Sequence, residues 1–140
     1  MIFLDSSFIV AYYNLDDQNH SRAVVLMKEI SDKKYGDLVI TDYIFDECIT
    51  VIFTRLKDIR KAIDAGETIR ESMFLKFLNE EEFESAWATF KSQNKTRFSF
   101  TDCSIIAFMR DRKINNLATF DNDFKKINDT YGHQSGDKVL

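Results

Sequence analysis

Short apolar runs that each end next to a polar segment constrain the fold of this chain most. The three clearest runs are Ile2-Phe3-Leu4, Leu38-Val39-Ile40 and Leu117-Ala118-Thr119. Continuous apolar runs of this length are typical of buried parallel strands, and amphipathic helical patterns lie between them. Because such strands are joined by right-handed helical crossovers, we predict an α/β protein: a three-layer α/β/α fold with a central parallel sheet.

Size and composition agree with one compact domain that spans residues 1–140. The 140 residues are 44% hydrophobic and 30% charged, which supplies enough apolar material for a core. No apolar run approaches the roughly 20 residues of a membrane-spanning helix, so we expect no membrane partner. The first residues lack the basic segment of a signal peptide. Cys48 and Cys103 lie in apolar helical patterns, so we expect a cytoplasmic location.

Four acidic residues border these apolar segments: Asp5, Glu47, Asp102 and Asp121. Asp5 and Asp121 follow predicted strands, Glu47 lies about one and a half turns into a helix, and Asp102 lies at a helix start. Since ligands of parallel α/β sheets bind at the carboxyl ends of the strands, we expect the four carboxylates to meet at one edge. A carboxylate at the border of a core needs compensation, and hard divalent cations prefer oxygen ligands.

This set of acids predicts metal-dependent hydrolysis of phosphodiesters. Carboxylates alone would repel a phosphate, whereas Mg²⁺ or Mn²⁺ held between them would reverse the local field and activate a water molecule. For the same reason, the net charge of −4 argues only weakly against a nucleic-acid substrate. Serine or cysteine hydrolase chemistry fits less well, because the two histidines, His20 and His133, lie beside no nucleophile motif. We therefore expect a nuclease.

The four blocks that contain these acids resemble the PIN-domain ribonucleases, and among those the VapC-type toxins. The blocks, in chain order, are IFLDSSFIVAYYNLDDQNHSRA, TDYIFDECITVI, FSFTDCSIIAFMRD and LATFDNDF. Each block alone has low specificity, but together they occur in the family's order at suitable intervals. The resemblance covers nearly the whole chain.

The resemblance implies a PIN-like fold and a Mg²⁺- or Mn²⁺-dependent endoribonuclease. The residues implied for catalysis and metal binding are Asp5, Glu47, Asp102 and Asp121, with Asp123 as an auxiliary metal ligand. Ser6 and Thr119 are implied to orient carboxylates or water by hydrogen bonding. Members of the toxin branch pair with a small antitoxin protein and commonly form homodimers. The expected partners are therefore an RNA substrate, an antitoxin and a second copy of the chain.

Alternatives stay open at this level. Asp5 and Asp102 each stand where a side chain can cap a helix, and Asp121 and Asp123 compete for one ligand position. The protein could be a PIN-like RNA-processing nuclease, or a module that holds RNA or a protein without cutting. Residues 123–140 are atypical for the family and resemble a segment of GGDEF-type diguanylate cyclases, although the GGDEF loop is not in the sequence. A cyclase-related signalling domain would predict GTP binding.

Overall fold

A computed structural model describes residues 1–126 and the backbone of residues 138–139. The strands are β1 (Ile2–Leu4), β2 (Leu38–Thr41), β3 (Phe74–Lys76), β4 (Asn116–Ala118) and β5 (Lys138–Val139). They form one sheet in the order β3-β2-β1-β4-β5, and every neighbouring pair is parallel. The predicted central parallel sheet is confirmed.

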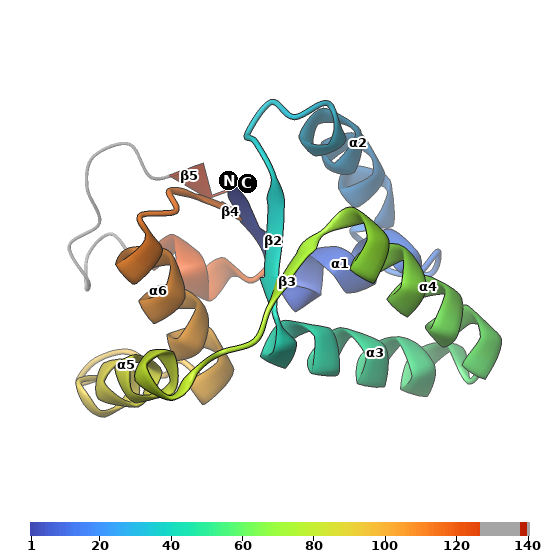
Figure 1. Cartoon of the computed structure of the whole chain (residues 1–140). Coiled ribbons are helices and arrows are strands. Elements are labelled where there is room, and N and C mark those ends of the chain that lie inside the picture. Colours follow the sequence, from blue (N-terminus) through green and yellow to red (C-terminus); the bar gives the residue numbers. More distant parts are fainter. Residues whose placement is uncertain (127–137, 140) are drawn as a thin grey trace.

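The helices cover both faces of this sheet (Figure 1). They are α1 (Ser6–Tyr13), α2 (His20–Ser31), α3 (Asp42–Leu56), α4 (Ile59–Ser72), α5 (Glu80–Lys91), α6 (Phe100–Arg112) and the 3₁₀ helix η1 (Asn122–Lys126). Helices α1 to α4 lie on one side of the sheet, and α5 and α6 lie on the other. This arrangement is the predicted three-layer α/β/α fold.

The register of the sheet brings the first strand and the fourth to the same level. Ile2 of β1 pairs with Leu38 of β2 and with Asn116 of β4, and Leu4 pairs with Ala118. The residues that follow, Asp5 and Thr119, therefore leave the sheet side by side at its carboxyl edge. The sequence predicted that Thr119 belongs to the fourth strand, but β4 ends one residue earlier, at Ala118.

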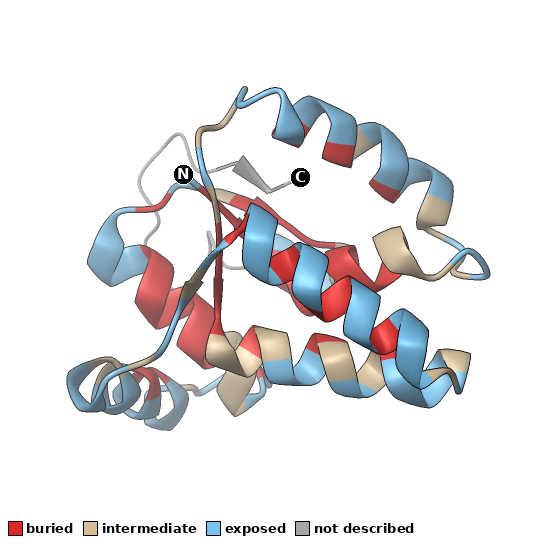
Figure 2. Cartoon of the chain, turned by 45° about the vertical axis from the view of Figure 1, so that its right-hand side comes forward, coloured by how far each residue is buried: buried red, intermediate tan, exposed pale blue. Residues whose placement is uncertain are grey.

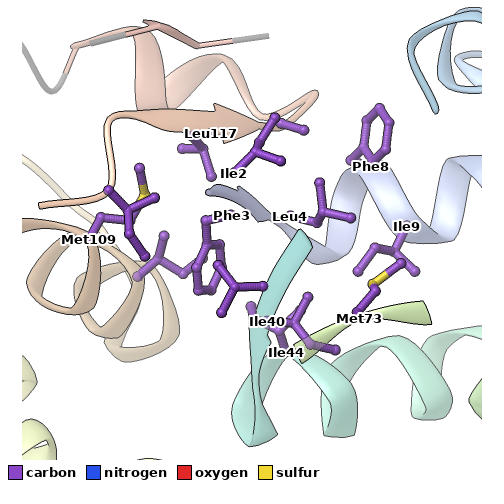
Figure 3. Packing of buried hydrophobic residues seen from close by; sticks show 14 of the residues in the cluster. Ile2, Phe3, Leu4, Phe8, Ile9, Ile40, Ile44, Met73, Met109 and Leu117 are labelled. Carbon is purple, nitrogen blue, oxygen red and sulfur yellow. The ribbon is translucent and has the colours of Figure 1, made fainter. Parts of the chain in front are cut away.

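The core is apolar and continuous across the sheet. The three residues of β1 are fully buried, and Figure 3 shows Leu4 on the side of the sheet that α1 covers, near Phe8 and Ile9. On the other face, the Phe3 ring packs edge-on against Phe108 of α6, with centroids 5.7 Å apart. Buried residues line the strands and the inner sides of the helices, whereas the outer sides are exposed (Figure 2). Burial on both faces explains why the strands are short, continuous apolar runs.

The helix starts show how polar residues position the chain. The capping box expected from Asn79 and Glu82 is present at the start of α5, as its spacing predicts. Helix α6 starts earlier than the Thr101 or Asp102 expected from sequence. Ser99 is its N-cap, and Asp102 is the third helical residue, which closes a second capping box with Ser99.

The atypical segment from residue 123 is only partly described. Its last strand was expected over residues 138–140, and β5 over Lys138–Val139 confirms it as an edge strand beside β4. Residues 127–137 and 140 lie outside the described part of the chain. That one domain spans residues 1–140 stays a prediction. Within the described residues, no helix combines the length and apolar character needed to cross a bilayer.

One backbone position makes a direct test of this packing. Gly36 precedes β2 with φ of +83°, and an added Cβ would lie 2.9 Å from the Met1 backbone nitrogen. We predict that Gly36→Ala lowers the free energy of unfolding by about 1–2 kcal/mol, because left-handed backbone is unfavourable for residues with a Cβ. Urea denaturation measures the change.

The control is the same substitution at Gly66 in the middle of α4. There the new Cβ would meet only side-chain atoms, the end of Ile49 at 3.1 Å and the Phe45 ring at 3.7 Å, and the glycine has no positive φ. Helix propensity favours alanine by about 1 kcal/mol, so Gly66→Ala should be tolerated. Equal losses at the two positions would contradict this account of the loop before β2.

Candidate active site

Asp5 is the buried centre of the site. It follows β1 directly, its backbone N–H donates to the Ala118 carbonyl at 3.0 Å, and the residue is only 5% exposed. It occupies the N-cap position of α1, yet its side chain makes no capping hydrogen bond. The alternative that Asp5 serves merely as a helix cap therefore fails, and its carboxylate is held for another purpose.

Two hydroxyl groups hold this carboxylate in place. Ser7 Oγ and Thr119 Oγ1 each donate to Asp5 Oδ2 at 2.7 Å. The same hydroxyls accept backbone N–H groups of the segment after β4: Phe120 N–H donates to Ser7 and Asp121 N–H to Thr119, both at 3.0 Å. The network ties the end of β1 to the end of β4. Neither hydroxyl binds Oδ1, which accepts a long 3.5 Å hydrogen bond from Ser6 Oγ.

Glu47 approaches Asp5 from α3. Burial of its carboxyl group raises the Glu47 pKa, and repulsion from Asp5 adds to the rise, while a hydrogen bond from Ser6 opposes it. Ser6 therefore stands between the two carboxylates, in agreement with the orienting role implied for it. The Glu47 residue itself reaches solvent at the surface of α3.

Asp102 reaches the site from the start of α6. Its Oδ2 accepts the Ser99 N–H at 3.1 Å, and its own N–H donates to Ser99 Oγ at 3.1 Å. Burial, together with repulsion from Asp5 and Asp121, raises the pKa of Asp102 to about 6. Asp102 is thus both a capping residue of α6 and a member of the acidic group. The two interpretations of this residue, as a helix cap and as a site residue, are therefore compatible.

The structure brings the four predicted acids together at the carboxyl edge of the sheet. Burial raises the pKa of Asp5, and repulsion from Asp121 adds to the rise. Repulsion from Asp5 likewise raises the pKa values of Asp102 and Glu47. Asp121 also contributes to the raised pKa of Asp102. Among the described residues, no three side chains of the His, Cys, Asp and Glu types already stand close enough to hold one ion jointly. The acids face one another without closing into a complete ligand cage.

The donor set nevertheless fits a hard divalent cation. Mg²⁺ keeps several waters and needs only one or two direct carboxylate ligands, so a loose group of acids suffices. Like charges that raise one another's pKa are stabilised by a cation between them. A further polar group is available nearby, because the buried Thr41 Oγ1 at the end of β2 has no hydrogen-bond partner in the described part of the structure.

Asp121, rather than Asp123, points to this centre. Asp121 acts electrostatically on both Asp5 and Asp102, and its Oδ1 accepts the Asp123 N–H at 2.9 Å. Asp123 itself lines a separate hollow with residues 95–98. The role of Asp123 as an auxiliary ligand stays a prediction. His20 supports α1 instead, because its Nδ1 is 2.9 Å from the Ala11 carbonyl oxygen.

A cavity of about 430 Å³ opens beside the acids. Its walls come from α1, α3, the turn before α2 and the segment after β4, and they include Ser6, Ser7, Glu47 and Asp121. A substrate in this cavity would therefore touch the acidic group from the solvent side. The cavity also includes Arg55, which belongs to the basic run over residues 55–61 that the sequence offers for contacts with RNA phosphates.

Sequence reasoning missed Ser7 as a functional residue. The implied orienting pair was Ser6 and Thr119, but Ser7 makes the shorter hydrogen bond to Asp5 and also binds the Phe120 N–H. The Ser6-Ser7 pair after Asp5 was the available signal. Which of two adjacent hydroxyls turns towards the carboxylate depends on the first turn of α1, and the sequence does not specify that.

Comparison with known proteins agrees with this geometry. Two relatives are the 23S rRNA-specific endonuclease VapC20 from Mycobacterium tuberculosis strains CDC 1551 / Oshkosh and ATCC 25618 / H37Rv. Each is 29% identical over 126 residues, which cover 89% of this chain and 92% of the relative. The crystal structure of Mycobacterium tuberculosis VapC20, described as a sarcin–ricin loop cleaving toxin, superposes with a TM-score of 0.77 at 27% identity, and the match covers 89% of this chain and 93% of that one.

The family assignment follows from a model that spans most of the chain. The PIN domain model matches residues 2–129, a range that contains all four acids, Ser7 and Thr119. The resemblance read from the four sequence blocks is confirmed. The chain belongs to the PIN domain family, and its similarity within that family is to the VapC-type toxins.

Proposed function

We propose that this protein is an endoribonuclease and acts as the toxin of a VapBC-type toxin–antitoxin pair. The observation that carries the proposal is the group of mutually repelling carboxylates around the buried Asp5, at the edge of the sheet where α/β proteins bind ligands. The similarity to VapC20, an endonuclease specific for 23S rRNA, supports RNA as the substrate. A cytoplasmic location belongs to the proposal and agrees with two free, buried cysteines.

The proposed cofactor is Mg²⁺ or Mn²⁺, held by Asp5, Glu47, Asp102 and Asp121, with Asp123 acting through water. When bound, such an ion would lower the pKa of a water molecule and stabilise the leaving oxygen of the phosphodiester. The protein holds the carboxylate ligands in place before the ion binds. Ser7 and Thr119 both bind Oδ2 of Asp5, so Oδ1 would be the oxygen available to an ion.

The other acids are positioned by the elements that carry them. The capping box with Ser99 fixes Asp102 at the start of α6, and Ser6 holds Glu47 towards Asp5. Residues that orient metal ligands typically change metal affinity or activity by about 10–100-fold when they are replaced. Ser7 and Thr119 are therefore positioning residues, while the acids are the catalytic ones.

Two exposed apolar surfaces are available for the proposed protein partners. The first, here called the aromatic surface, consists of Tyr43, Phe83, Trp87, Phe90 and Phe100, whose rings pack against one another. The second is a groove of about 300 Å³ between α3 and α4. We assign the aromatic surface to the homodimer, since aromatic side chains are enriched at such interfaces, and the groove to an antitoxin segment, since grooves between helices accept amphipathic segments.

Cleavage tests the proposed activity directly. The purified protein should cut a sarcin–ricin loop hairpin or a mixed RNA pool with Mn²⁺ and should not cut with EDTA. Asp5→Asn should reduce cleavage at least about a hundredfold, beyond the loss expected for a positioning residue. The matched control is Asp64→Asn, an exposed acid on α4 that does not line the cavity beside the acids. Full activity of Asp5→Asn would contradict the assignment, and metal binding without any cleavage would favour a non-catalytic RNA-binding module.

The raised carboxylate pKa values predict how pH and metal affect stability. Burial raises the folded-state pKa of Asp102 to about 6, from an ordinary value of 3.8. The metal-free protein therefore loses stability as pH rises from about 4 to above 6. Asp102→Asn keeps an acceptor for the Ser99 N–H but removes the charge, so it should reduce this loss. Mn²⁺ should raise the melting temperature at pH 7 in the parent more than in Asp102→Asn. Thermal denaturation with EDTA and with Mn²⁺, at pH 5 and pH 7, measures both effects. Identical melting temperatures of the wild-type protein and Asp102→Asn under all four conditions would exclude the metal site.

Sedimentation velocity tests the assignment of the aromatic surface. Trp87 is 41% exposed and stacks on Phe90 with centroids 5.6 Å apart. Trp87→Glu should convert a dimer into a monomer, because it places a charge in the centre of the buried area. Phe53→Glu, on the α3–α4 side and 47% exposed, should leave the dimer intact. A dimer that survives Trp87→Glu but not Phe53→Glu would reverse the two assignments.

A further inference from the structure

The cavity beside the acids carries opposite charges on one helix. Glu47 and Arg55 both belong to α3 and both line the cavity. They are eight residues apart, which is about 12 Å along a helix that rises 1.5 Å per residue. The acidic end suits a metal-assisted cut, and Arg55 lies about two helical turns further along the same wall of the cavity.

Arg55 is held over the cavity by a weak contact. Its Nη1 lies 3.8 Å from Asp17 Oδ2, and its side chain is 56% exposed. Strong charge-assisted hydrogen bonds are about 2.7–2.9 Å long, so this ion pair orients the side chain without engaging it closely. A guanidinium has five N–H donors in a planar fork that matches phosphate oxygens. Arg55 is therefore placed to exchange the Asp17 contact for a phosphate.

The remaining wall is polar and well supported. Gln18 and Asn19 line the cavity next to Asp17, and the Asn19 N–H donates to Asp17 Oδ1 at 2.8 Å, which fixes the turn. Amide side chains offer both donors and acceptors, as hydrogen bonding to the edge of an unpaired base requires. Phe120 closes the opposite side, with the Arg22 guanidinium 5.4 Å from its ring centroid.

We propose that this cavity binds a nucleotide next to the cut, with Arg55 holding its phosphate and the Gln18–Asn19 turn facing its base. The inference rests on the proposed function, and it names the substrate-binding part of that site. The cavity volume of about 430 Å³ lies within the range of small-ligand pockets, about 300–1,000 Å³. It also gives an acidic protein a local positive contact for RNA.

Fluorescence anisotropy of a labelled RNA tests this subsite, with Asp5→Asn as the background that does not cut. The RNA probe is the sarcin–ricin loop hairpin, whether or not the wild-type protein cuts it. Adding Arg55→Gln should weaken binding of this hairpin about tenfold at low salt, as expected for the loss of one charged hydrogen-bonding contact. It should also lower the slope of log affinity against log salt by about 1. Arg60→Gln, an exposed arginine of α4 outside the cavity, is the matched control and should change binding less than twofold.

A double-mutant comparison separates this subsite from general electrostatics. Asp17→Asn keeps the acceptor for Asn19 N–H but removes the anion that competes for Arg55. It should tighten binding when Arg55 is present and have no effect when Arg55→Gln is also present. Equal effects of Arg55→Gln and Arg60→Gln, or additive effects of Asp17→Asn, would overturn the proposal while leaving the nuclease intact. If Arg55→Gln weakens RNA binding and Arg60→Gln does not, but the wild-type protein cuts no RNA, the subsite stands and the nuclease is rejected. If the protein binds no RNA at all, both proposals are rejected.

Discussion

The site depends on one buried carboxylate. Asp5 sits at the end of the central strand with 5% exposure, where an ionised group is stable only with hydrogen bonds or a cation. Ser7 and Thr119 supply two hydrogen bonds to one oxygen, and their own acceptor positions hold the backbone after β4. The same contacts that compensate the charge therefore place Asp121, so the fold and the site have a common support.

The other acids reach Asp5 because of the topology of the sheet. With β1 in the centre, the segments after β1 and β4 emerge together, and α3 and α6 begin close to the same edge. Glu47 and Asp102 then come from opposite sides of the sheet. Burial and repulsion from Asp5 raise the pKa values of both residues. The group of acids therefore destabilises the folded chain alone and favours a bound cation. This is the electrostatic pattern expected of a metal-dependent nuclease.

Much of this arrangement could be predicted from the sequence. Continuous apolar runs predicted β1, β2 and most of β4. The position of each acid beside such a run led to the prediction of Asp5, Glu47, Asp102 and Asp121 as site residues, and the structure places them within electrostatic reach of one another. The Asn79–Glu82 spacing determined a helix start. Other features depended on three-dimensional details: α6 begins at Phe100 because Ser99, rather than Thr101 or Asp102, is its cap. The contacts of Ser7 and Arg55 depend on how the first turn of α1 and the turn before α2 pack against α3. The hydrophobic pattern of each segment does not specify how the segments pack together.

Locating the ion would test the central claim most directly. Anomalous diffraction at the manganese absorption edge, from crystals soaked in Mn²⁺, shows where the metal binds without reference to any substrate. The account predicts an anomalous peak at the carboxyl edge of the sheet, among Asp5, Glu47, Asp102 and Asp121, and no peak there in crystals of Asp5→Asn. A parent crystal with manganese bound elsewhere and none at this edge would contradict the account.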